Sequence, residues 1–194
     1  LRDLVAPEAP IRRRVRDVSK YPQFKSKSLV SYTVQIPSPA LVQRLRQMGL
    51  TSNKSYDLQM PPVPDEHFAP FIRGVFDGDG SVTMLAPNKA RDGDKATCLC
   101  LRITYCGTES FMTSLASRLH ELANNSLKVA SRTRPNVHCW RIYYGAYRDT
   151  IGLFRYMYAP TPEDPSSIPH LPRKWAKFMG FKPYAIERGW WAET

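Results

Sequence analysis

The stretch FIRGVFDGDGSV, residues 71–82, leads from an apolar helical pattern into two aspartates that alternate with glycines. The apolar residues that recur at helical spacing before and within it are Phe68, Phe71, Ile72, Val75 and Phe76. Upstream, Pro64 and Asp65 are start signals, with Asp65 in the N-cap position. The stretch therefore predicts one helix that ends in an acidic, glycine-rich tip.

Two glycines lie one turn apart on one side of this expected helix. Gly74 and Gly78 each cost about 1 kcal/mol relative to alanine in a helix interior, which favours a packing reason over merely tolerated glycines. Because they carry no side chains, a second helix can approach their backbone closely. The pair predicts a helix-packing face.

Two carboxylates follow at the end of the helix, where the last carbonyls lack partners and the helix dipole leaves partial negative charge. Asp77 and Asp79 would be repelled there unless a hard divalent cation binds. Mg²⁺ accepts carboxylate, carbonyl and water oxygens together, and the glycines are expected to supply the positive-φ turns that aim these oxygens. A plain acidic turn is the alternative left open. A calcium loop fits poorly, because the twelfth position from Asp77 is Asn88 rather than a glutamate.

The segments around this stretch predict alternating helices and strands. Strands are expected at 81–86, 96–105, 127–133 and 137–144. Helices are expected at 108–125, 148–159 and around 173–181. Thr108 is the expected N-cap of the first of these helices, and an asparagine pair is its expected C-cap. The order helix, two strands, helix, two strands, helix predicts an α+β fold.

The N-terminal part of the chain resembles part of the C-terminal one. YTVQI followed by the helical PALVQRLRQMGL mirrors WRIYY followed by RDTIGLFRYMYA, and Lys54 lies opposite Lys174. We therefore expect residues 1–60 to be the C-terminal remnant of a first copy and residues 61–194 to be a complete second copy. The alternative is that any strand, strand, helix unit resembles another.

The charge of the chain indicates a polyanionic partner. Lys and Arg number 28 against 17 Asp and Glu, a net charge of +11. Such a field favours nucleic acid, and a basic protein that merely stays soluble is the alternative. Without a membrane-spanning apolar run or signal-peptide order, we expect a soluble intracellular protein, cytoplasmic or organellar and not secreted. The spacing of the cysteines favours reduced thiols over disulfides or zinc: Cys98, Cys100, Cys106 and Cys139.

FIRGVFDGDGS, preceded by GLTSNKSYDLQMPPVPDEHFAP, resembles the second motif of a two-repeat LAGLIDADG homing endonuclease. The order of elements is similar to the αββαββα repeat of that family, with its curved antiparallel DNA-binding sheet, and the resemblance extends over nearly the whole chain. It implies that Asp79, the acid before the last motif glycine, binds a divalent metal at the scissile phosphate. The Gly78 carbonyl is the implied auxiliary ligand, and Asp77 is implied to be more structural.

The same resemblance implies Mg²⁺ as the cofactor, or another divalent cation such as Mn²⁺ or Ca²⁺. Such an ion polarises a phosphate oxygen and orients a water molecule. The family keeps a lysine in the last helix region of each repeat, and Lys54 and Lys174 match these places. With Asp79 they form the expected catalytic set, and plain surface lysines are the alternative for both.

Alternation along the expected strands assigns side chains to a DNA-facing side. Leu101 and Ile103 point inward and leave Arg102 and Thr104 outward. The outward set contains no acid, which favours phosphate and base contacts in the major groove over a merely solvated face. The residues expected to bind DNA are Arg12, Arg14, Arg16, Thr33, Gln35, Thr83, Arg102, Thr104, Lys128, Arg132, Arg134, Arg141 and Tyr143.

These features predict a site-specific endonuclease that hydrolyses phosphodiester bonds of double-stranded DNA at the tips of paired motif helices. The sequence holds one such helix, so a second motif is expected from a companion chain or from a homodimer mate. We favour the companion chain, because the first-copy remnant has no motif helix of its own to pack on. The alternative from another class is a non-catalytic binder with this fold, an RNA maturase or a DNA-binding regulator.

Overall fold

The structure, a computed structural model, describes residues 6–23, 26–50, 56–85, 99–134, 138–158 and 168–191. The chain divides into two compact units, Leu1–Gln47 and Met48–Thr194. This division falls before the boundary expected at residue 60, because Leu58 and Met60 pack against the core of the second unit. The Thr108 hydroxyl also donates a hydrogen bond to the Leu58 carbonyl.

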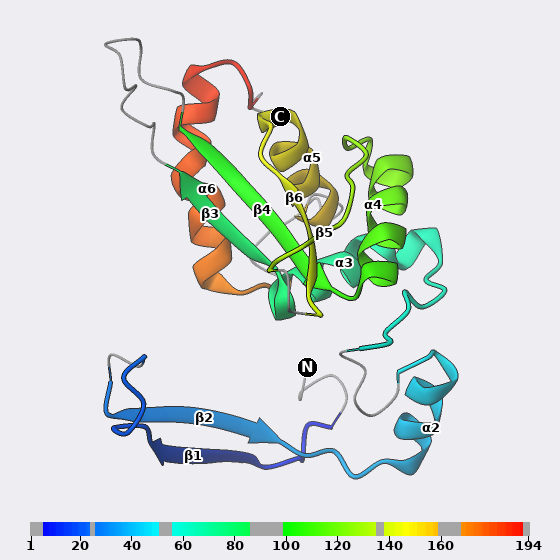
Figure 1. Ribbon diagram of the computed structural model, residues 1–194, viewed down its shortest axis with the longest axis vertical. Helices are drawn as coiled ribbons and strands as arrows, with labels where there is room; N and C mark the ends of the chain where they lie inside the picture. Colours follow the sequence, from blue (N-terminus) through cyan, green and yellow to red (C-terminus); the bar gives the residue numbers. More distant parts are fainter. Residues whose placement is uncertain are drawn as a thin grey trace. The chain divides into compact units, whose positions relative to one another are not determined.

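The first unit is an antiparallel β-ribbon followed by a helix (Figure 1). Its elements are β1 (Ile11–Asp17), β2 (Ser28–Val34) and α2 (Pro39–Gln47). Every strand residue is exposed, and α2 buries none of its residues. The strand register gathers five exposed apolar side chains on one face: Ile11, Val15, Val30, Tyr32 and Val34. No described residue of this unit buries that apolar face.

The second unit has the element order that the sequence predicts. Its elements are α3 (Asp65–Asp79), β3 (Ser81–Leu85), β4 (Cys100–Gly107), α4 (Glu109–Ala123), β5 (Ser131–Arg132), β6 (Trp140–Tyr144), α5 (Tyr147–Tyr158) and α6 (Pro172–Glu187). The order αββαββα, followed by the further helix α6, confirms the α+β class. Among the helices that the structure describes, none is long and apolar enough to cross a membrane.

One antiparallel sheet organises this unit, with strand order β3-β4-β6-β5. The helices lie against one face of the sheet (Figure 1). Strand residues buried beneath them are Val82, Leu101, Ile103, Tyr105, Ile142 and Tyr144. Because successive strand residues point to opposite faces, the residues between them form a second face that the helices leave open.

Helix α3 forms because its apolar residues recur every fourth position: Phe68, Ile72 and Phe76 are fully buried. The helix begins at Asp65, and its N-cap is Pro64, which supplies no side-chain hydrogen bond. The prediction of Asp65 as N-cap is therefore wrong. The Asp65 carboxylate instead forms an ion pair with Arg118 of α4.

Helix α4 confirms both predicted caps. The Thr108 hydroxyl accepts a hydrogen bond from the Phe111 N–H at 3.2 Å. Asn124 takes the left-handed conformation at the C-cap, with φ 51°, which asparagine adopts more readily than most residues. Local side-chain chemistry thus decides where this helix begins and ends.

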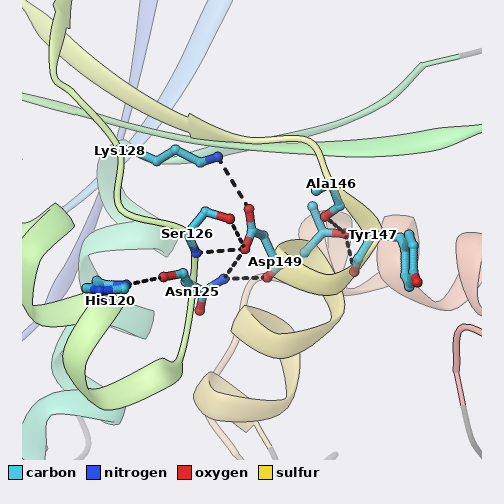
Figure 2. Close-up of polar contacts among 8 residues, drawn as sticks. His120, Asn125, Ser126, Lys128, Ala146, Tyr147 and Asp149 are labelled. Atoms are coloured by element: carbon cyan, nitrogen blue, oxygen red, sulfur yellow. Dashed lines mark hydrogen bonds and ion pairs between the residues drawn. The ribbon is translucent and has the colours of Figure 1, made fainter.

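The strand expected at 127–133 is shorter in the structure, where β5 holds only Ser131 and Arg132. The segment before it is tied to the start of α5 through buried Asp149 (Figure 2). The Asp149 Oδ1 accepts hydrogen bonds from the Ser126 N–H at 2.9 Å and from the Ser126 hydroxyl at 3.0 Å. Ser126, just before the expected strand, is thus fixed to the start of α5.

Candidate active site

The end of α3 and the residue after it, Asp77–Gly80, form the α3 tip. Gly80 closes it with an N–H that donates to the carbonyls of Phe76, at 3.0 Å, and Val75, at 3.3 Å. A Cβ at Gly80 would lie 2.7 Å from the Phe76 carbonyl oxygen, so only glycine fits this turn. Neither Gly78 nor Gly80 has a positive φ, so the expectation of positive-φ turns at these glycines is wrong. Gly80 is instead required by its close approach to the backbone of Phe76.

The two aspartates of the α3 tip face different surroundings. Asp77 Oδ2 accepts a hydrogen bond from the Leu171 N–H at 3.2 Å, just before α6. Burial raises the pKa of Asp77, and the Leu171 hydrogen bond opposes this shift. Asp79, in contrast, is exposed at the last position of α3. Asp77 is thus held within the fold, and Asp79 is the carboxylate that an external group can reach.

Lys174 of α6 lies beneath the α3 tip and is only 2% exposed. Its ammonium donates to the carbonyls of Phe76, of Asp77 at 3.1 Å and of Gly80 at 2.6 Å. It also lies 4.6 Å from the centre of the Phe76 ring. Burial lowers the pKa of Lys174. All three ammonium protons therefore have carbonyl acceptors within the chain. The other expected catalytic lysine, Lys54, lies outside the described residues.

The α3 tip offers oxygen donors of the kind that Mg²⁺ prefers. Asp79 supplies an exposed carboxylate, and the Gly78 carbonyl accepts no hydrogen bond from any residue that the structure describes. Across the described ranges, no three His, Cys, Asp or Glu side chains gather in an arrangement that could hold a metal ion. This donor set fits Mg²⁺, which commonly keeps water and binds through one or two carboxylates plus phosphate.

An open groove of about 450 Å³ follows the exposed side of α3. Its helix residues, here called the glycine face, are Phe71, Gly74, Val75 and Gly78. A Cβ built at Gly74 or Gly78 meets no atom within 4 Å, so neither glycine is needed for packing among the described residues. The groove continues to Asp79. Among the described residues, nothing covers Gly74 or Gly78, and their role in packing a second helix stays a prediction.

The open side of the sheet, here called the outer face, carries Ser81, Thr83, Arg102, Thr104, Arg141 and Tyr143. The register sets Thr83 opposite Arg102 and Thr104 opposite Tyr143. The Arg102 guanidinium lies 5.4 Å from the centre of the Tyr143 ring. No described residue of the outer face is an acid. Strand β3, which contributes to this face, begins two residues after Asp79.

Three other residues expected to face DNA lie elsewhere in the second unit. The Lys128 ammonium lies 3.4 Å from Asp149 Oδ2, and it also lies over the ring of buried Tyr144. Arg132 pairs opposite Trp140, with its guanidinium 5.4 Å from the Trp140 ring centre, so it lies on the opposite side of the sheet from Arg141. Arg134 is exposed beyond β5.

In the first unit, the expected basic face is present. Arg12, Arg14 and Arg16 alternate on one side of the ribbon, and Arg12 pairs opposite Thr33. Gln35 follows β2 and is exposed. These residues lie on the side of the ribbon opposite to its apolar face.

The sequence patterns did not predict that two thiols lie near Asp79. Cys106 and Cys139 are free thiols that line the groove beside Asp79. Burial raises the pKa of the Cys106 thiol, and the neighbouring Cys139 adds to the effect. No local pattern could bring them together, because their proximity arises from the pairing of β4 with β6.

No protein-family model matches the sequence. No curated protein matches it either. Among solved structures, the I-SmaMI LAGLIDADG homing endonuclease bound to cleaved DNA has a TM-score of 0.47 and 13% identity, over 77% of this chain and 44% of that chain. The homing endonuclease I-TnaI has a TM-score of 0.44 and 11% identity, over 66% of this chain and 76% of that chain.

The homing endonuclease I-CvuI, in complex with a DNA target in the presence of Mg, has a TM-score of 0.38 and 9% identity. That similarity covers 49% of this chain and 57% of I-CvuI. This chain covers 37% of the LAGLIDADG meganuclease I-AabMI. I-SmaMI, I-TnaI and I-CvuI are homing endonucleases and I-AabMI is a LAGLIDADG meganuclease, and the likeness of this chain to them is one of fold.

Proposed function

We propose that the chain is part of a metal-dependent DNA endonuclease in which Asp79 binds the divalent cation. One observation carries this proposal: the exposed carboxylate of Asp79 lies at the start of an outer face that holds arginines and no described acid. The Asp79 carboxylate would attract a divalent cation, and the arginines would attract a phosphodiester backbone, whose phosphate oxygens could then complete the shell of the ion.

Each part of the α3 tip has a role in this proposal. Asp79 and the Gly78 carbonyl would hold Mg²⁺, or Mn²⁺ or Ca²⁺ in its place, with water and a DNA phosphate completing the shell. The bound ion would polarise the scissile phosphate and offset the charge of the leaving oxygen. Gly80 allows the turn that exposes Asp79, and Asp77 anchors the α3 tip to the backbone at Leu171.

Two DNA-binding surfaces are proposed, one on each unit: the outer face of the second unit and the basic face of the ribbon. Arg102 and Arg141 would contact phosphates or guanine edges, and Thr83, Thr104 and Tyr143 would contact bases or the backbone. In the first unit, the residues proposed for DNA are Arg12, Arg14, Arg16, Thr33 and Gln35. Lys128 and Arg132 are left out of these surfaces, since the first binds Asp149 and the second lies on the Trp140 side.

The partner is proposed to be a second motif helix from a companion chain. Among the described residues the glycine face is open, and the lack of side chains at Gly74 and Gly78 would let such a helix approach α3 closely. Within the first unit, no described residue covers the apolar face of the ribbon. The test below must distinguish this companion chain from a second copy of the same chain.

The test selects bound duplexes from a randomised DNA library and then adds Mg²⁺. The natural protein is expected to cut one strand or both, and Asp79→Asn is expected to bind the same duplexes without cutting. Glu121→Gln, an exposed acid of α4, is the matched control. Equal cutting by Asp79→Asn would reject the assignment of Asp79. Light scattering of the active species distinguishes a homodimer from a chain that needs a companion.

A non-catalytic binder is the second candidate, and one observation favours it. Lys174 uses its ammonium on backbone carbonyls, and Asp79 is the single exposed carboxylate of the α3 tip. A binder of this fold would hold RNA or DNA tightly with EDTA present and would cut neither. Binding that survives EDTA, combined with intact duplex after long incubation in Mg²⁺, would favour this candidate over the nuclease.

A further inference from the structure

The ammonium of Lys174 selects among the carbonyls of the α3 tip. It binds those of Phe76, Asp77 and Gly80, and it leaves the Gly78 carbonyl without a hydrogen bond from the described residues. Carbonyls at the end of a helix lack helical partners and carry its negative pole. A buried cation at this position therefore decides which of these carbonyls stay available to a ligand.

We propose that Lys174 is a positioning residue, which acts through the backbone of the α3 tip so that Gly78 and Asp79 are aligned for a divalent cation. This inference rests on the proposed function. It gives Lys174 a different role from the catalytic one that the resemblance implies, because a side chain 2% exposed with three carbonyl acceptors has no proton left for DNA.

Two features of the surroundings make Lys174 effective in this position. Burial excludes water, so each charge-assisted hydrogen bond is stronger than at the surface. The Phe76 ring, 4.6 Å from the ammonium, restricts its position from one side. Lys174 also lies in the first turn of α6, close to Leu171, whose N–H donates a hydrogen bond to Asp77. One end of α6 thus holds the α3 tip by both a side chain and a backbone donor.

The inference separates Lys174 from a residue that merely stabilises the fold. A stabilising lysine would alter the free energy of unfolding alone. A positioning lysine would also alter the affinity for a cation in protein that is fully folded. Removal of groups that orient metal ligands typically weakens metal binding by about 10-fold to 100-fold.

The test is a titration of the full chain with Mn²⁺ alone, followed by the electron paramagnetic resonance signal of free Mn²⁺. Lys174→Met and Lys174→Gln remove the charge, Lys174→Arg keeps it, and Lys177→Met, an exposed lysine of the same helix, is the control. Circular dichroism first selects the variants that fold. Affinity is expected to fall at least about tenfold in the neutral variants and less in Lys174→Arg, with Lys177→Met unchanged.

A second measurement needs no variant at position 174. The ¹⁵Nζ resonance of Lys174 in the natural protein is expected to shift on addition of Mg²⁺, and the Asp79→Asn protein is expected to lose that shift. Unchanged Mn²⁺ affinity in a folded neutral variant, with Asp79→Asn unable to bind, would overturn the inference and leave the proposed function standing. If Asp79→Asn bound Mn²⁺ as well as the natural protein, both would fall.

Discussion

Lys128 Nζ lies 3.4 Å from Oδ2 of Asp149, whose carboxylate is buried in the fold (Figure 2). Oδ1 of Asp149 accepts hydrogen bonds from the N–H and the hydroxyl of Ser126. The side-chain amide of Asn125 donates a hydrogen bond to the backbone carbonyl of Asp149 at 2.9 Å. The cluster joins the end of α4 to the start of α5. A lysine that a strand pattern assigns to DNA is therefore a partner within the fold.

The first prediction concerns this ion pair. Lys128→Met is expected to lower the free energy of unfolding by about 1–2 kcal/mol, because it leaves the buried Asp149 carboxylate without its cation. Asp149→Ala is expected to cost about 3 kcal/mol or more, since it also removes the acceptor for Ser126. Urea unfolding measures both, with Lys177→Met as control. Unchanged stability with weaker DNA binding in Lys128→Met would instead return Lys128 to the DNA surface.

The second prediction concerns the glycine face. Gly74→Ala is expected to raise the free energy of unfolding of this chain by up to about 1 kcal/mol, because alanine is the better helix former and the site is open. Gly74→Leu is expected to fold but to block the approach of a partner helix, and so to abolish cutting. Thermal unfolding and sedimentation of the active assembly are the measurements. A loss of stability in Gly74→Ala would mean that the position is already filled.

The third prediction concerns the turn after α3. Gly80→Ala is expected to destabilise the fold by about 2 kcal/mol, because its Cβ would lie 2.7 Å from the Phe76 carbonyl oxygen. Gly152→Ala, in α5, is the matched control, since a Cβ there meets nothing within 4 Å. Chemical denaturation compares the two variants, and equal effects would contradict the close approach at Gly80.

The fourth prediction concerns two buried tyrosines. The hydroxyls of Tyr144 and Tyr158 have no hydrogen-bond partner among the described residues, and burial raises the pKa of both. Tyr144→Phe and Tyr158→Phe are therefore expected to be neutral or to stabilise the fold by about 1 kcal/mol. Tyr105→Phe is the comparison, because the Tyr105 hydroxyl donates to the Met157 sulfur at 3.5 Å. Clear destabilisation by the first two would reveal partners such as bound water.

The fifth prediction concerns the outer face. Arg102→Ala is expected to weaken DNA binding and to reduce the slope of log affinity against log salt by about one, as expected for loss of one phosphate contact. Its stability should change little, because the side chain is exposed. Fluorescence anisotropy over a salt series measures the slope, with Lys177→Ala as control. An unchanged slope would remove Arg102 from the phosphate-binding set.

Sequence patterns predicted those elements whose causes are local. The ends of α4 follow from Thr108 and Asn124, which cap the helix through their own side chain and backbone. The burial of Leu101 and Ile103 follows from strand alternation in the same way. The expected N-cap at Asp65 is wrong because Pro64 takes that position, and the Asp65 carboxylate pairs with Arg118, far along the chain. Likewise no local pattern shows that Ser126 binds Asp149 or that β5 holds only Ser131 and Arg132.

The sequence by itself determined the order of helices and strands, the acidic tip with its glycines, and the basic character of one sheet face, since these depend on neighbours along the chain. Only the tertiary structure decided which atoms at the tip are free. Lys174 reaches Gly80 across 94 residues and occupies three carbonyls, while Asp77 is held at Leu171 and Asp79 stays exposed. Such choices follow from packing between distant segments, because hydrogen bonds form wherever folding brings donor and acceptor together.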